Sequence, residues 1–369
     1  MNQLFRWDQT GLFLLALAAG ILPFAVPEVC AAALREGLTL CSGPLLLSLF
    51  PFLVVSRLLI QCPESDLLAL PFRLAAWGIG IRTPCAARVL CIGFLGGFAP
   101  AASAAAQAVR TGQLTAEEAD ALLPACICSG PSFVVLTVGQ SLLGSAELGV
   151  LLFASQITAN YLTAALLNRF AGVRSVKPGS AAPAFPAPPR LDEILADAAI
   201  TYCKLCGFIL FFRMLAAGAG ALLPAGAGTL CSILLEVCSG CDLASRTGRW
   251  GSLLCCAALS VQGLSVLLQV RTICPPEMTL RPLYRSRLLH LPLSLALFYL
   301  LLPGGEADVF STLPARVLLM RRVPPDCALL VFAVCCMAAC TLRSGIRQVE
   351  QKQMARNAGG CCINSKTLL

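Results

Sequence analysis

Charged residues are scarce in this chain: Asp, Glu, Lys and Arg make up only 12% of its 369 residues. A soluble domain typically carries about a quarter. Apolar residues make up 57% of the chain, and its mean hydropathy is +0.80. Several apolar runs reach the roughly 20 residues that an α-helix needs to cross a bilayer. The composition therefore excludes an ordinary soluble domain and indicates an all-α polytopic membrane protein.

Histidine occurs only once, as His290. The 21 cysteines lie mostly in apolar runs, where thiols act as small hydrophobic side chains. Two pairs have the spacing of a metal or redox site, Cys203-x-x-Cys206 and Cys238-x-x-Cys241. No histidine accompanies them and an apolar span separates them, which argues against such a site. With no P-loop, no Ser/His/Asp set and no paired carboxylates, we expect neither an enzyme nor a metal or cofactor site.

Eight apolar segments are long enough to cross a membrane: 11–29, 38–60, 121–143, 146–168, 200–223, 251–270, 285–302 and 324–342. Two more, 85–109 and 226–241, are interrupted or short, and we expect each to enter the membrane and return as a re-entrant hairpin. The segment 171–190 holds five prolines and no acidic residue, which predicts an extended linker. It separates two membrane halves, 1–170 and 191–342, and a basic tail follows at 343–369.

The first apolar segment has two interpretations. Arg6 before it and small residues after it are typical of a cleaved signal peptide. Pro23, Pro27 and the many later spans favour a retained helix instead.

Lys and Arg are distributed unevenly between the two sides of this arrangement. One side holds 19 of the 27 basic residues and the other 6, while Lys204 and Arg213 lie within a span. Cytoplasmic loops carry the excess of Lys and Arg in membrane proteins. We therefore expect a cell-membrane protein with both termini in the cytoplasm. The net charge of +8 then reflects orientation in the bilayer, and no nucleic-acid partner is expected.

The two halves repeat one pattern with opposite orientation. Segment 38–60 runs inward before the hairpin 85–109 and two spans, whereas segment 200–223 runs outward before the hairpin 226–241 and two spans. Inverted-topology repeats are typical of secondary transporters, whose solute sites lie at the repeat interface near the bilayer midplane.

Glycines and a proline interrupt the apolar stretch GFLGGFAPAASAAAQ at residues 93–107. Irregular backbone at membrane depth is tolerated only where it is buried in protein or lines a wet cavity. We therefore expect Gly97 and Pro100 to form the tip of a hairpin that other helices cover.

Polar side chains within the apolar segments are candidate ligands for a small polar solute or ion. Gln156 and Asn160 share one helix face. Gln262, Ser265 and Gln269 share another. Amides and hydroxyls also join membrane helices, at about 1 kcal/mol or less each, whereas a buried carboxylate such as Glu236 is costly and usually functional. The candidate substrate-binding residues are Gly97, Pro100, Ser129, Ser132, Gln156, Asn160, Glu236, Ser239, Gln262, Ser265 and Gln269.

Two other polar features have a structural interpretation. Thr115 and Glu118 predict a capping box at the start of a charged, solvated surface helix. His290, at the start of a span beside Arg287, is expected at the membrane interface rather than as a ligand.

Four stretches carry a family resemblance: GGFAPAASAAAQAVRTGQLTAEEADALL, CSGPSFVVLTVG, ILLEVCSG and GLSVLLQV. Together they resemble the sporulation integral membrane proteins of the YlbJ type, which carry the nucleoside-recognition (Gate) domain. The likeness covers about residues 38–300 and includes LFPFLVVSRLL of the second span. It implies a transporter-like inverted-repeat fold and a role in spore formation, moving a nucleoside-like solute or an anion. The alternative is a non-transporting membrane scaffold that binds a partner protein in spore formation.

The family's hairpin tip reads close to G-Y-P-x-G-A, and this chain departs from it. Pro100 is kept, but Phe98-Ala99 precede it and Ala101-Ala102 follow it. The absence of the later glycine narrows the backbone freedom at the tip.

The orientation is testable. We expect the linker 171–190 and the tail after Arg343 to be cytoplasmic, because the basic excess lies on their side. Cysteines in either segment should react with an impermeant thiol reagent only after intact cells are permeabilised. Labelling of either segment from outside would contradict the orientation.

Overall fold

The computed structural model describes residues 9–62, 65–171 and 191–302. Within these ranges every regular element is a helix and no strand occurs, which confirms the predicted all-α class. The helices are α1 Gln9–Ala25, α2 Pro27–Ser42, α3 Pro44–Gln61, α4 Ser65–Leu68, α5 Leu70–Gly78, α6 Pro84–Gly96, α7 Phe98–Arg110, α8 Ala116–Cys126, η1 Ser132–Leu142, α9 Ala146–Ala171, α10 Leu191–Leu222, α11 Ala225–Leu235, α12 Val237–Ser245, η2 Gly248–Trp250, α13 Gly251–Val261, α14 Gly263–Ile273 and α15 Arg281–Leu301. The linker 171–190 beyond Ala171, the segment 324–342 and the tail 343–369 lie outside the described residues.

Three stretches of the described chain are long and apolar enough to cross a membrane: α9, α10 and Gly248–Ile273. A fourth is obtained if α1 and α2 count as one, although the chain bends by 108° between them. The segment 11–29 is therefore divided by this bend and is not one straight helix. These helices support a membrane-embedded α-helical protein.

Two pairs of helices fold back on themselves as antiparallel hairpins. A Cβ atom on Gly93 of α6 would lie 3.2 Å from the Cβ of Ala101 in α7, so the chain reverses at Gly97. A Cβ on Gly240 of α12 would lie 2.8 Å from the backbone of α11, so the chain reverses again at Glu236. These contacts join residues that are seven or eight positions apart in the chain. In one straight helix such residues would be separated by more than about 10 Å along the axis, so neither segment is a straight helix. Both reversals occur within the segments 85–109 and 226–241.

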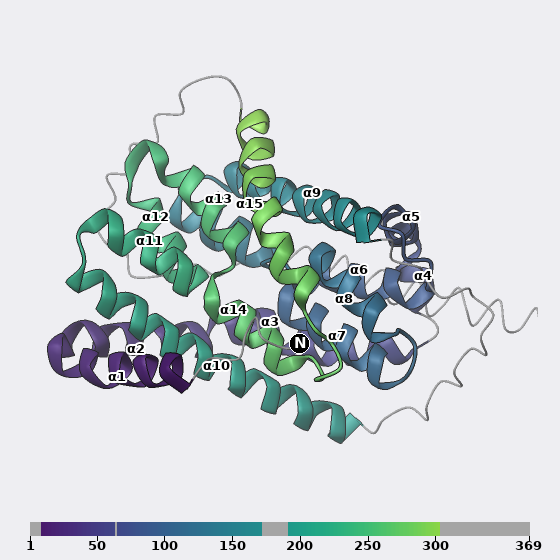
Figure 1. The fold of residues 1–369 in the computed structure, drawn as a ribbon, viewed down its shortest axis with the longest axis horizontal. Coiled ribbons are helices and arrows are strands. Elements are labelled where there is room, and N and C mark those ends of the chain that lie inside the picture. Colours follow the sequence, from purple (N-terminus) through teal and green to yellow (C-terminus); the bar gives the residue numbers. More distant parts are fainter. Residues whose placement is uncertain (1–8, 63–64, 172–190, 303–369) are drawn as a thin grey trace, which may run out of the picture.

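Two further helices are broken rather than reversed. After α8 the chain is irregular at 127–130, and η1 then follows as a π-helix, a form often found at functional sites. Between α13 and α14, Gln262 and Gly263 take φ values of 65° and 66°. The segments 121–143 and 251–270 are therefore interrupted near their middles. In Figure 1, α14 lies between the group α11–α13 and the group α6–α8.

Small side chains allow the first hairpin to sit deep in the fold. α7 packs against α3, α6, α8 and α14. Close helix packing in membranes relies on such residues because they let the backbones approach. Seven alanines of α7 are at most 1% exposed: Ala99, Ala101, Ala102, Ala104, Ala105, Ala106 and Ala108.

The capping box at the start of α8 is confirmed, since the Thr115 side chain accepts from the Glu118 N–H and Glu118 accepts from the Thr115 N–H. The prediction of a solvated surface helix is wrong. Glu118 and Asp120 are 3% and 6% exposed. Asp120 accepts hydrogen bonds from the N–H of Thr279 (2.8 Å), its hydroxyl (2.7 Å) and the N–H of Leu280 (3.1 Å). This carboxylate therefore fixes the loop that starts α15, where Leu280 takes the left-handed φ of 56°.

Asp120→Ala should destabilise the fold, because it leaves two backbone N–H groups and a hydroxyl without their acceptor. We expect a loss of about 3 kcal/mol in the free energy of unfolding. Thermal unfolding in detergent measures it, and Glu117→Ala is the control, since Glu117 is exposed in the same turn. Equal small effects of the two substitutions would contradict the role of Asp120.

Candidate functional site

Each hairpin tip rests on the broken helix of its own half. A Cβ on Gly97 would lie 2.7 Å from the backbone N of Gly130, and a Cβ on Gly263 would lie 3.0 Å from the backbone N of Glu236. Backbone thus meets backbone at both places. Gly97 also takes φ 81° and ψ −163°, a conformation that is essentially restricted to glycine.

The two breaks are joined to each other across the halves of the chain. The side-chain amide of Gln262 donates to the Ser129 hydroxyl at 3.4 Å and to the Leu259 carbonyl at 2.6 Å. Both Ser129 and Gln262 are buried. We call the meeting point of tips and breaks the junction, defined by Gly97, Ser129, Gly130, Glu236, Gln262 and Gly263.

A cavity of about 60 Å³ opens beside the junction. Four of the predicted site residues line it: Ser129 and Ser132 from the first half, and Glu236 and Gln269 from the second. The other walls are mainly apolar side chains of α3, α10 and α14 and the tip of the first hairpin. A space of this size holds a few waters or a small ion.

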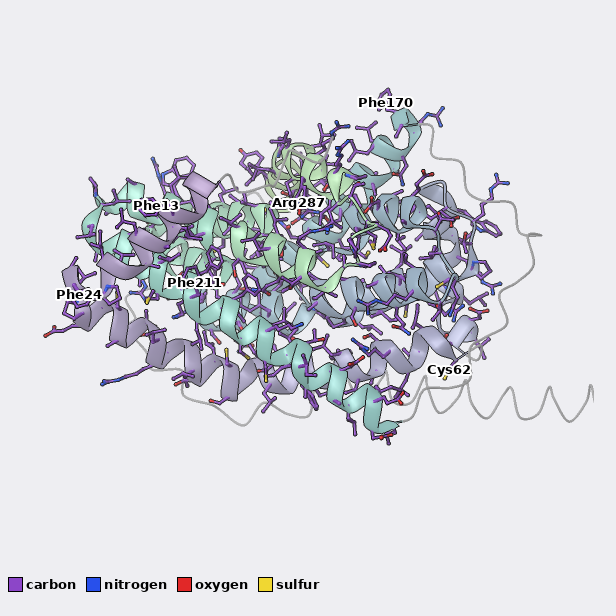
Figure 2. All side chains as sticks on the ribbon, turned by 60° about the horizontal axis from the view of Figure 1, so that its bottom comes forward. Phe13, Phe24, Cys62, Phe170, Phe211 and Arg287 are labelled. Atoms are coloured by element: carbon purple, nitrogen blue, oxygen red, sulfur yellow. The ribbon has the colours of Figure 1, made fainter. Side chains whose placement is uncertain are left out.

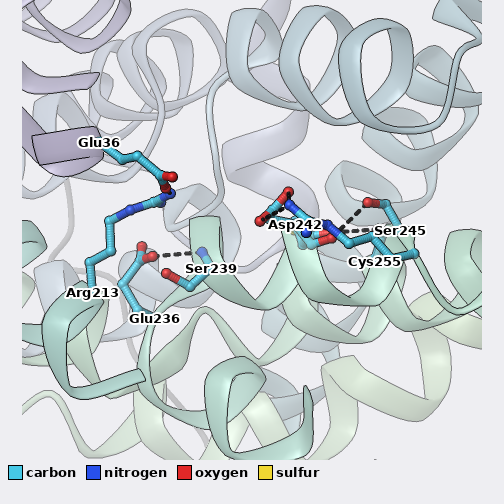
Figure 3. Close-up of polar contacts among 9 residues, drawn as sticks. Glu36, Arg213, Glu236, Ser239, Asp242, Ser245 and Cys255 are labelled. Carbon is cyan, nitrogen blue, oxygen red and sulfur yellow. Dashed lines mark hydrogen bonds and ion pairs between the residues drawn. The ribbon is translucent and has the colours of Figure 1, made fainter. Parts of the chain in front are cut away.

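Among the described residues, Glu236 is the only carboxylate that lines this cavity, and it is 2% exposed. Its side chain caps α12 by accepting from the N–H groups of Cys238 (2.9 Å) and Ser239 (2.7 Å), as Figure 3 shows for Ser239. Arg213 of α10 lies alongside and interacts with it electrostatically. The helix N-terminus and the cation compensate the buried charge. The donors are thus backbone groups of the same half, not amides of the opposite half as the sequence hypothesis expected.

Arg213 also connects Glu236 to the surface of the protein. Its guanidinium pairs with Glu36 of α2 at 2.7 Å. The Arg213 side chain is 11% exposed and that of Glu36 is 65% exposed. Glu36, Arg213 and Glu236 therefore form a series of groups of alternating charge, from the surface at α2 to the buried carboxylate.

Gln156 and Asn160 lie outside the cavity, in a second polar group that we call the arginine cluster: Gln156, Asn160, Ser260, Arg287, His290 and Ser294. Gln156 donates to the Ser260 hydroxyl at 2.9 Å, and His290 contacts the Gln156 carbonyl at 3.2 Å. His290 is 0% exposed and Arg287 is 7% exposed, so the prediction of an interfacial histidine is wrong. Figure 2 shows Arg287 in the middle of the helices, whereas Phe24 projects at the edge.

Arg287 stabilises the helix ends that the breaks create. Its guanidinium donates to the Ser260 carbonyl at 3.4 Å and to Asn160 Oδ1 at 3.2 Å, and Asn160 donates to the Ile127 carbonyl at 3.3 Å. Both carbonyls belong to the C-terminal ends of broken helices, α13 and α8, where partial negative charge accumulates. Within the described part of the chain no carboxylate pairs with Arg287. The sequence signal for this cluster was an arginine within the predicted span 285–302, where a charged side chain needs partners inside the protein.

The remaining predicted residues shape the junction without lining the cavity. Pro100 packs against Gly96, whose added Cβ would lie 2.9 Å from the proline ring. The Ser265 hydroxyl accepts from the Gln269 amide at 2.9 Å. Ser239 contributes its backbone N–H to Glu236. Among the described residues, no three His, Cys, Asp or Glu side chains gather closely enough to hold a metal ion.

No family model, curated protein or solved structure matches this chain.

Gly97→Ala should destabilise the fold by about 3 kcal/mol or more, because it combines an unfavourable backbone conformation with a clash against Gly130. Gly112→Ala is the matched control: Gly112 also has a positive φ, of 71°, but nothing lies within 4 Å of an added Cβ. We expect the control to lose about 1 kcal/mol. Thermal unfolding of both variants in detergent provides the comparison, and equal losses would show that the tip does not rest on the break.

Proposed function

We propose that this chain is a multi-pass, transporter-like membrane protein that binds a small polar solute or ion at the junction. One observation supports the proposal most strongly. The two hairpin tips and the two helix breaks, one of each from either half, meet beside the buried carboxylate of Glu236. Irregular backbone at membrane depth is tolerated where it lines such a cavity, and transporters form their sites this way.

The order of elements supports inverted-topology repeats. The first half has α3, the hairpin α6–α7, the broken helix α8–η1 and α9. The second half has α10, the hairpin α11–α12, the broken helix α13–α14 and α15. If both hairpins enter the membrane and return, the bias of Lys and Arg to one side gives these two series of helices opposite orientations in the bilayer. Hairpin arms of nine to 13 residues are each too short to cross a bilayer, which fits a dip and return.

The chemistry of the cavity narrows the solute class. Glu236 offers a carboxylate, and the side-chain oxygen of Gln269, which also lines the cavity, is buried without a hydrogen-bond partner among the described residues. The side-chain oxygen of Gln262, in the adjacent junction, is likewise unpartnered among those residues. Acceptors of this kind hold a cation or a solute rich in N–H and O–H donors. Of the two classes that the resemblance implies, the nucleoside-like solute fits this cavity better than an anion.

A solute larger than a few waters requires the walls to move apart. The hairpin α11–α12 carries Glu236; it packs against η1 of the first half and against α10, α13 and α14 of the second. Movement of this hairpin would enlarge the cavity while leaving the arginine cluster in place. Rigid-body displacement of one unit against another is the usual basis of alternating access.

The proposal predicts solute-dependent stabilisation that depends on Glu236. Purified protein should show a rise in melting temperature with a member of a panel of nucleosides and small cations. Glu236→Gln should abolish that rise while changing the free energy of unfolding by only about 1 kcal/mol, because the isostere keeps the packing and one cap acceptor. The matched control is Glu118→Gln, which alters another buried helix-capping glutamate that does not line the cavity.

The outcome separates the proposal from its alternative. A response that is lost in Glu236→Gln and kept in Glu118→Gln supports a solute site. A response that persists in Glu236→Gln removes Glu236 from the site. No response across the panel, together with co-purification of one fixed membrane partner, would favour a non-transporting scaffold in spore formation.

A further inference from the structure

A larger cavity, of about 170 Å³, lies away from the junction, where four helices converge. It is bounded by the C-terminal ends of α3, α7 and α14 and by the first half of α10. The charged residues that line it are Arg57, Arg110, Lys204 and Asp197. Three cations and one carboxylate leave an excess of two positive charges. We call this space the basic cavity.

The positive charge of the basic cavity is only partly neutralised within the chain. Arg57 pairs with Asp197 at 2.5 Å, but its Nε is buried without a hydrogen-bond partner among the described residues. Arg110 and Lys204 form no ion pair within those residues. A single carboxylate, itself 57% exposed, therefore faces three cations.

A buried hydroxyl also faces this space. Ser103 is 3% exposed, lines the cavity and makes no side-chain hydrogen bond within the described residues. The hydroxyls of Thr201 and Thr272, by contrast, donate to carbonyls of their own helices at 2.8 Å. The donors left over are thus Ser103 and the three cations.

We infer that the basic cavity binds a phosphate group, carried by an acidic lipid headgroup or by the free anion. Arginine presents planar, directed donors to phosphate oxygens and lysine acts as a point charge, and both together with a hydroxyl form the usual donor set for this group. The volume suits a tetrahedral anion with some of its water. The inference is independent of the junction, because no residue lines both cavities.

The position of the basic cavity fits the same assignment. The excess of Lys and Arg predicts that the C-terminal ends of α3, α7 and α14 and the start of α10 lie on the cytoplasmic side. These four helix ends converge at the basic cavity. Basic pockets between membrane helices on the cytoplasmic side recognise anionic headgroups.

The test uses the purified full chain in a neutral detergent with three probes: dioctanoyl phosphatidic acid, dioctanoylglycerol and sodium phosphate. Melting temperature is followed against probe concentration. Phosphatidic acid should stabilise the protein, and dioctanoylglycerol, which lacks the phosphate, should not. A matching effect of sodium phosphate identifies the free anion as the ligand, whereas an effect of phosphatidic acid alone identifies a lipid headgroup.

Arg110→Gln combined with Lys204→Gln removes the two unpaired charges, both on exposed side chains, so folding should persist. We expect the apparent affinity for phosphatidic acid to fall about tenfold or more. The charge-matched control is Arg169→Gln with Arg285→Gln, two exposed arginines outside the cavity, which should stay within about twofold. Ser103→Ala is a second, charge-neutral variant and should also weaken binding.

Three results would overturn the inference. One is an equal loss in the charge-matched control, which would indicate general surface attraction. Another is equal stabilisation by dioctanoylglycerol, which would indicate binding of the acyl chains. The third is no response of the wild-type chain to either phosphate-bearing probe.

Discussion

Backbone groups that leave the helical pattern inside an apolar structure need new hydrogen-bond partners, and the centre of this fold depends on how they are supplied. The N-terminal end of α12 receives a carboxylate from Glu236. Carbonyls at the C-terminal ends of α8 and α13, those of Ile127 and Ser260, receive Asn160 and Arg287. The charges of Glu236 and Arg287 are opposite in sign to the partial charges of the helix ends that they cap, and Asn160 supplies a neutral N–H donor. Breaks that would otherwise be destabilising are thereby held in fixed positions.

The same constraint explains the glycines at the contacts. Capped helix ends can meet only if no side chain stands between them, and Gly97 against Gly130 and Gly263 against Glu236 leave no room for a Cβ. The backbones touch there, and Ser129 completes the connection between the halves through its bond to the side chain of Gln262. A cavity remains beside the contacts because the apolar walls that surround them do not fill the space.

Much of this arrangement was accessible from the sequence. The reversals at Gly97 and Glu236 fall in the two segments expected to fold back. The break at Gln262 and Gly263 was missed, because segment 251–270 was expected to be one continuous span. Periodicity was less informative, because it assigned Gln156 a helix face without saying which neighbour that face meets. The helix α8 and His290 were wrongly placed at the surface because the charged residues beside them were taken to be solvated. In the structure, Asp120 and Arg287 instead satisfy backbone groups of distant segments. Long-range capping leaves no local pattern in a sequence.

Four helices, α3, α7, α10 and α14, form walls of both cavities, which couples the two spaces mechanically. α10 contributes Lys204 to the basic cavity and Ile209 to the central one, about 7.5 Å further along its axis. α14 contributes Thr272 and Gln269 in the same way, and the first hairpin reaches both spaces through α7. If these helices move as rigid bodies, a shift that widens one cavity also displaces walls of the other. The central cavity presents hydrogen-bond acceptors and the basic cavity presents donors, so the ligands proposed for the two spaces differ. Occupation of the basic cavity would therefore bias the position of α10 and α14 without competing for the central site.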